Sequence, residues 1–219
     1  MRIDGLHFIY FADPMCSWCW GFAPVARLLR QRYGEVLPVR VVMGGLRPGT
    51  AIPMNDKAKA EVRTHWEHVR EASGQPFDYG LFDRDDFVYD TDPGARAVVL
   101  ARRTDRDIAL TYLEHAQRAF YAEGRDVTRF DVLADLAGEL GFDRDSFRAG
   151  LEDESLQQET WRDYAISQRA GVTGFPTLIV GPNADGTFAL VTRGYQPAEA
   201  VVPAIDNWLS QVRPPEDVL

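Results

Sequence analysis

Apolar residues follow strand-like and helix-like patterns in turn along this chain. Residues 6–12 form a nearly continuous apolar and aromatic run closed by Asp-Pro at 13–14, which is typical of a buried strand that ends in a turn. Helical spacing follows over residues 16–33, and residues 36–43 return to strand character. This strand-helix-strand order predicts a parallel pair of strands joined by a crossover.

Helical spacing dominates the middle of the chain, roughly residues 50–171, where no convincing strand pattern occurs. Asp92-Pro93 supplies the cap and first turn of one helix, and Thr128 is the predicted cap of another. Three apolar stripes recur at helical spacing: Ala109, Tyr112, Leu113, Ala116 and Phe120; Phe130, Leu133, Leu136 and Leu140; Leu156, Trp161 and Tyr164. Because such stripes need a partner to cover them, we expect a helical subdomain here.

Strand character returns near the end of the chain, at residues 177–181 and 187–193. A five-residue connection rich in turn formers joins these two segments, so we expect an antiparallel hairpin. A last amphipathic helix has Val201, Ile205 and Trp208 on its inner face. The whole order predicts an α/β fold, a mixed four-stranded sheet with flanking helices, interrupted once by helices.

The pattern also predicts how the chain is divided. Residues 1–49 together with 172–212 are predicted to form the sheet domain, residues 50–171 the inserted helical subdomain, and residues 213–219 a flexible tail.

Composition and charge narrow the possible functions. The chain has 219 residues, is 45% hydrophobic and 26% charged, and can bury a sizeable core. Its net charge of −9 disfavours nucleic-acid or anionic-membrane partners, because no basic face can form without dense acidic neighbours. No run of 18 apolar residues is present, and residues 6–12 are too short for a secretory signal, so we expect a cytoplasmic protein.

The only two cysteines lie three positions apart, in Cys16-Ser17-Trp18-Cys19, at a predicted strand-to-helix junction. Unpaired N–H groups and the helix dipole at such a junction favour negative charge, so Cys16 is the better thiolate and attacking sulfur. Cys19 lies one turn into the helix, on the same side, and should be less exposed. This arrangement suits reversible closure of a disulfide, with Cys19 as the resolving thiol.

Three other features allow different interpretations. A C-x-x-C pair can supply half of a zinc site, but we disfavour that interpretation, because no second C-x-x-C exists and the other ligands would have to come from four histidines and the carboxylates. His65 and His68 have helical spacing beside two glutamates, and we favour a solvated helix face over a metal site. The glycine-rich residues 44–49 lack a phosphate-loop signature, and we interpret them as the exit into the insertion and as a candidate wall of a substrate groove around the cysteine sulfurs.

The segment Asp13–Phe22, DPMCSWCWGF, resembles the active site of the cytoplasmic, FrnE-like branch of the DsbA thioredoxin superfamily. This resemblance implies a thioredoxin-like fold with a helical insertion after the second strand. The segment Gly171–Thr177, GVTGFPT, is similar to the family's cis-proline loop. The resemblance therefore implies that Pro176 follows a cis bond and that the Phe175 backbone faces the cysteines and pairs with an extended substrate.

The prediction is thus a thiol–disulfide oxidoreductase. Its predicted catalytic residues are Cys16 and Cys19, its predicted substrate-binding residues are Ser17, Trp18, Phe175 and Pro176, and neither a metal nor a cofactor is expected. Its expected partners are protein or small-molecule thiols and disulfides, glutathione among them. The two cysteines do not encode the direction of electron flow, and a cytosolic location favours a reductase or isomerase.

Two alternatives remain open. A glutathione-dependent isomerase or transferase similar to the kappa-class and 2-hydroxychromene-2-carboxylate isomerase group has the same implied architecture. That group uses a serine where Cys16 stands and needs no resolving cysteine, so the intact pair argues against it. A non-enzymatic binding module would use the helical block to hold a partner, and its thiols would have no catalytic role.

Overall fold

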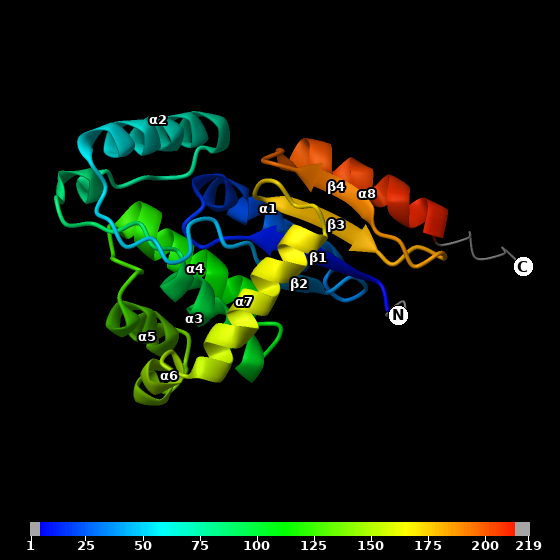
Figure 1. Ribbon diagram of the computed structural model, residues 1–219. Coiled ribbons are helices and arrows are strands. Elements are labelled where there is room, and N and C mark those ends of the chain that lie inside the picture. Colours follow the sequence, from blue (N-terminus) through cyan, green and yellow to red (C-terminus); the bar gives the residue numbers. More distant parts are fainter. Residues whose placement is uncertain (1–4, 213–219) are drawn as a thin grey trace, which may run out of the picture.

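The computed structural model describes residues 5–212, in which a four-stranded mixed sheet packs with eight α-helices (Figure 1). The elements follow in the order β1 (His7–Ala12), α1 (Ser17–Tyr33), β2 (Val39–Met43), α2 (Asp56–Ser73), the 3-10 turn η1 (Gly80–Asp83), α3 (Asp92–Thr104), α4 (Ala109–Glu123), α5 (Phe130–Glu139), α6 (Arg144–Gly150), α7 (Glu154–Arg169), β3 (Thr177–Gly181), β4 (Ala189–Arg193) and α8 (Ala198–Val212). The predicted tail, 213–219, lies outside the described residues.

The sheet has the strand order β2-β1-β3-β4. Strand β1 pairs in parallel with β2 and antiparallel with β3, and β3 pairs antiparallel with β4. The predicted parallel pair, the hairpin and the mixed four-stranded α/β sheet are therefore confirmed. Strand β2 begins later than predicted, because the N–H groups of Val36 and Leu37 bond to the Tyr33 carbonyl and complete a turn after α1.

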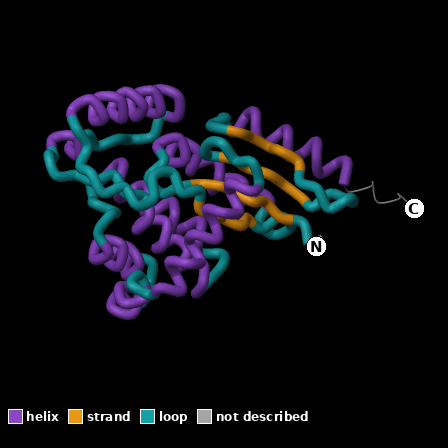
Figure 2. The backbone as a smooth tube through the Cα atoms, in the orientation of Figure 1, coloured by secondary structure: helices purple, strands orange, loops and turns teal. Residues whose placement is uncertain are grey.

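Helices α2 to α7 all lie between β2 and β3 in the sequence, and we call them the helical block. In Figures 1 and 2 most of this block extends from one end of the sheet, away from both termini.

Two details of the helical block differ from prediction. Arg129, not Thr128, is the residue before the start of α5, because the Thr128 hydroxyl donates a hydrogen bond to Asp126 Oδ1 instead of capping the helix. Trp161 of α7, predicted on the inner stripe, is 52% exposed because only Leu156 and Tyr164 of that stripe face the core.

A cluster of aromatic rings holds the upper part of the helical block together. Trp66 of α2 is 1% exposed, and its ring centre lies 5.7 Å from that of Phe120 and 4.9 Å from that of Tyr121, both on α4. The contacts are edge-to-face, which is a favoured arrangement of aromatic rings. Helix α2 is thereby anchored to α4, and one wall of the cavity described below is held in place.

An ion pair joins the helical block to the sheet edge. Arg102 of α3 lies with Nη1 2.7 Å from Asp163 Oδ2 on α7, and the Asp163 side chain is only 6% exposed. Arg102 also donates to the Val41 carbonyl at 2.8 Å, and Asp163 accepts the Met43 N–H at 2.9 Å. The pair therefore satisfies two backbone groups of the edge strand β2 that no other strand reaches.

None of the helices within residues 5–212 combines the length and the apolar character that a membrane span needs.

Candidate active site

Cys16 lies at the entrance of helix α1, where the chain leaves β1. It is the cap residue of the helix, with extended backbone angles of φ −94° and ψ 114°. No side chain caps this helix end, and its first turn contains no acidic residue. The positive end of the helix dipole is therefore not offset, which suits a sulfur that carries negative charge during disulfide exchange.

Cys19 lies one turn further along α1 and is fully buried, whereas Cys16 is 6% exposed. Both are free thiols, and they lie close enough for Cys16 to influence the pKa of the Cys19 thiol. Burial above all, and then the hydrogen bond and charge of Cys16, raise the pKa of the Cys19 thiol well above its ordinary value. Cys19 is thus held as a neutral thiol behind the more exposed sulfur.

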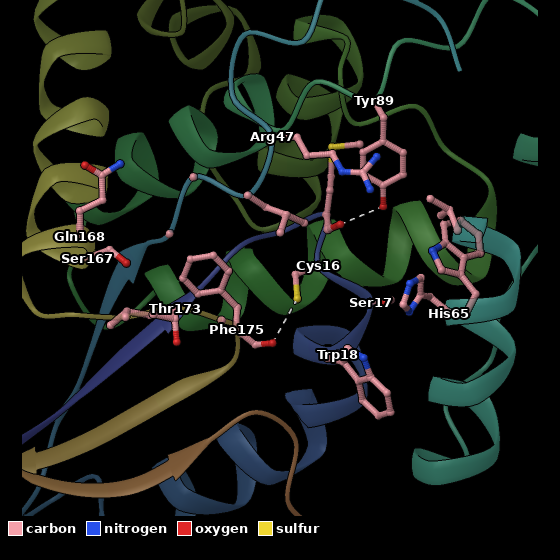
Figure 3. Close-up of a pocket in the computed structure, with 18 residues that line it drawn as sticks. Cys16, Ser17, Trp18, Arg47, His65, Tyr89, Ser167, Gln168, Thr173 and Phe175 are labelled. Atoms are coloured by element: carbon pink, nitrogen blue, oxygen red, sulfur yellow. Dashed lines mark hydrogen bonds between the residues drawn. The ribbon is translucent and has the colours of Figure 1, made fainter. Parts of the chain in front are cut away.

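The Cys16 thiol donates a hydrogen bond of 3.6 Å to the backbone carbonyl of Phe175 (Figure 3). Phe175 precedes a cis peptide bond to Pro176, in the loop that leads into β3. The Phe175 ring covers Gly44, and a Cβ at Gly44 would overlap that ring, so the close approach needs glycine. The cysteine segment, the loop before β3 and the segment after β2 therefore meet at one place.

A cavity of about 450 Å³ opens beside Cys16. It is lined by Met15, Cys16, Ser17, Trp18, Gly44, Gly45, Leu46, Arg47, Val62, His65, Trp66, Tyr89, Ser167, Gln168, Val172, Thr173, Gly174 and Phe175. Of the residues predicted as a site, Cys16, Ser17, Trp18 and Phe175 line this cavity, whereas Cys19 and Pro176 are buried outside its lining. The Trp18 ring is half-buried, 5.7 Å from the ring of Tyr195 between centres.

Three ionisable lining residues were not predicted as site residues: Arg47, His65 and Tyr89. Arg47 belongs to the glycine-rich segment that was only a candidate wall, and His65 is exposed on α2, as predicted, yet faces the cavity. Tyr89 has no local signal in the sequence, because its hydroxyl reaches across the fold to donate to the Met15 carbonyl at 2.9 Å. Residues 5–212 assemble no group of three or more His, Cys, Asp or Glu side chains as a metal site.

Asp13 connects two of the chain segments that line the cavity. It is fully buried, and its two carboxyl oxygens accept the N–H groups of Met15 and Leu46, each at 2.9 Å. Burial is the largest influence and raises the pKa of the Asp13 carboxyl to about 6, although both hydrogen bonds act in the opposite direction. One carboxyl group thus ties the segment that carries Cys16 to the segment that carries Arg47.

Comparison with known proteins gives consistent results. The family model described as the DSBA-like thioredoxin domain matches residues 8–205. A solved structure from Nitrosomonas europaea, provisionally described as a protein disulfide isomerase, has a TM-score of 0.87 and 35% identity, covering 95% of this chain and 99% of that one. The cytosolic disulfide reductase DsbM from Pseudomonas aeruginosa has a TM-score of 0.78 and 27% identity, covering 94% and 99%, and it has also been solved with GSH.

Curated relatives are more distant. The ClpXP adapter protein SpxH of Bacillus subtilis is 25% identical over 175 residues, which is 79% of this chain and 57% of the relative. SpxH of Halalkalibacterium halodurans is 22% identical over 204 residues, or 91% of this chain and 66% of the relative. The chain thus spans somewhat more than half of the length of these relatives.

Proposed function

Because the chain belongs to the DsbA-like thioredoxin domain family, we propose that it is a thiol–disulfide oxidoreductase with Cys16 as nucleophile and Cys19 as resolving thiol. One observation carries the proposal: the Cys16 sulfur borders the cavity at a helix entrance, and the fully buried Cys19 thiol lies one turn behind it, close enough for Cys16 to raise its pKa. The solved neighbours described as a disulfide reductase and, provisionally, a disulfide isomerase support the same kind of reaction.

The reaction that this arrangement suits proceeds in two exchanges. The Cys16 thiolate attacks one sulfur of a substrate disulfide, the substrate S–S bond breaks, and one substrate thiolate leaves. Cys19 then loses its proton and attacks Cys16 Sγ, so that the internal disulfide forms and the second substrate thiolate leaves. The substrate gains two electrons and the enzyme loses two. Two molecules of a reducing thiol restore the enzyme by the reverse steps and become a disulfide.

The remaining predicted site residues have proposed roles in binding. Phe175 presents its carbonyl to Cys16 and its ring to the cavity, which suits contact with a substrate backbone next to the reacting sulfur. Ser17 and Trp18 lie between the cysteines along the chain and line the cavity, where they can contact the leaving half of a disulfide. Pro176 is buried, so its proposed role is to position Phe175 and not to touch substrate.

Glutathione is the proposed small-molecule partner. The DsbM structure with GSH supports this proposal, and a cavity of about 450 Å³ falls in the size range of small-ligand sites. The description of DsbM as a cytosolic disulfide reductase supports net reduction and a cytoplasmic location for this chain as well.

Trapping of the mixed disulfide tests the proposal. Reduced wild-type protein mixed with glutathione disulfide should lose two hydrogens by mass spectrometry as the internal disulfide forms. Cys19→Ser should keep one glutathionyl group on Cys16, because no resolving thiol releases it. Cys16→Ser is the matched control and should form neither product at a comparable rate. Equal adduct formation in the Cys16→Ser variant would contradict the assigned roles.

A further inference from the structure

The cavity beside Cys16 differs in charge from the chain that surrounds it. The chain has 33 acidic and 24 basic residues, yet none of the 18 residues that line the cavity is Asp or Glu. Arg47 and His65 are its only ionisable lining residues apart from Cys16 and Tyr89. Asp13 does not line the cavity, and both of its carboxyl oxygens accept backbone N–H groups. A negatively charged substrate in this cavity is therefore attracted by the Arg47 guanidinium and is not repelled by any lining carboxylate.

Arg47 is held in place on the wall of this cavity. Its N–H donates to Thr91 Oγ1 at 3.1 Å, and its carbonyl accepts the Thr91 N–H at 3.3 Å. The guanidinium carbon lies 5.2 Å from the centre of the Tyr89 ring, and the Tyr89 hydroxyl is bonded to the segment just before Cys16. Figure 3 shows Arg47 beside Tyr89, with Cys16 below them in this view and His65 to its right. The position of Arg47 is thus coupled to that of the reactive sulfur.

The charge of Arg47 is not neutralised by any acidic side chain that the structure describes. No carboxylate oxygen of residues 5–212 lies within 4.0 Å of its side-chain nitrogens. Arg102, by contrast, is paired with both Asp163 and Glu159. A guanidinium that is oriented but unpaired can bind a carboxylate through two parallel hydrogen bonds.

We propose that this cavity selects small thiols and disulfides that carry carboxylates, and that Arg47 binds one substrate carboxylate while the substrate sulfur meets Cys16. This inference rests on the proposed function and names its substrate class. Glutathione belongs to that class, since each molecule has two carboxylates and one thiol. Arg47 acts as a residue that determines specificity, because it holds the substrate and takes no part in the exchange of electrons.

Single-turnover oxidation of the reduced protein by three disulfides tests the selection. The probes are anionic glutathione disulfide, neutral bis(2-hydroxyethyl) disulfide and cationic cystamine, each followed by acid quench and mass spectrometry. Arg47→Glu should lower the rate constant for glutathione disulfide by about tenfold or more relative to the neutral probe, and should raise the relative rate for cystamine. Arg47→Gln, which removes charge without adding the opposite one, should shift the ratios less, in the same direction.

Arg40→Glu is the charge-matched control. Arg40 is exposed on β2, has no carboxylate partner among the described residues and does not line the cavity. This variant should change the ratio of anionic to neutral rates less than about twofold, since its charge acts through solvent. Unchanged ratios in both folded Arg47 variants would overturn the inference and leave the proposed function standing. Failure of all three probes to oxidise the wild-type protein would instead overturn the proposed function itself.

Discussion

The sheet part of the molecule, made of β1 to β4 with α1 and α8, and the helical block of α2 to α7 contribute to the cavity in different ways. The sheet part supplies both sulfurs, at the start of α1, and the Phe175 carbonyl, just before β3. The helical block and the segments that lead into it supply Arg47, His65 and Tyr89, which are placed by contacts between distant side chains. Reactivity thus depends on two cysteines at a helix start and on one carbonyl that the sheet brings to them, whereas the proposed selectivity depends on how the helical block packs.

Replacement of Cys16 should have the largest effect and should separate reactivity from stability. Cys16→Ala should lower the rate of disulfide reduction by about three orders of magnitude or more, because no other sulfur can reach the substrate. Its free energy of unfolding should change by only about 1 kcal/mol, since one small, slightly exposed side chain is shortened. Turnover of hydroxyethyl disulfide and urea unfolding measure the two quantities. A variant that retains most of its turnover would remove Cys16 from the mechanism.

Replacement of Phe120 in the helical block should give the reverse pattern. Phe120 is 2% exposed and packs against Trp66 and Tyr121, so Phe120→Ala should lower the free energy of unfolding by about 3–5 kcal/mol. The thiol exchange rate of the folded fraction should fall far less than in Cys16→Ala. Trp161→Ala is the matched control, since this exposed ring should change stability by about 0.5 kcal/mol or less. Similar losses in both variants would contradict the assignment of the core.

The ion pair of the helical block that contacts the edge strand β2 can be tested at Arg102. Arg102→Ala leaves the buried Asp163 carboxylate and the Val41 carbonyl without their partner, and should lower the free energy of unfolding by about 3 kcal/mol. Arg103→Ala removes a neighbouring arginine whose ion pairs are more exposed, and should cost about 1 kcal/mol or less. Chemical denaturation of both variants measures the difference. Equal costs would mean that burial of the pair does not matter.

The smallest expected effect is a pH dependence that comes from Asp13. Its folded-state pKa of about 6 lies above the ordinary value of 3.8. Between pH 3.8 and pH 6, therefore, the folded state holds a proton that the unfolded state has already lost. This carboxyl therefore lowers stability as pH rises from about 4 to 6, and the full cost of about 3 kcal/mol at most is present above pH 6.

Asp13→Asn removes that titration. The stability of the wild-type protein minus that of the variant should accordingly be larger at pH 4.5 than at pH 7, by about 1–2 kcal/mol. Urea unfolding at the two pH values checks the sign. A difference that grows with pH would contradict the raised pKa of Asp13.

Most of the fold could be predicted because its signals are local. The apolar runs at residues 6–12 and 177–181 and the helical spacing between them depend only on neighbours in the chain. The short helix α6, Arg144–Gly150, was missed because seven residues show too little periodicity. Trp161 was placed on the wrong face, because helical spacing identifies a stripe but not which of its members another element covers.

By itself the sequence determined the order of the strands and helices and the position of Cys16 and Cys19 at a helix start, since these follow from backbone preferences over a few residues. Only the tertiary structure decided that Arg47 lies beside Tyr89 at the cavity, and that a buried Asp13 links its walls. Such contacts join residues more than 30 positions apart. They depend on how the helical block packs against the sheet, and no local pattern encodes that packing.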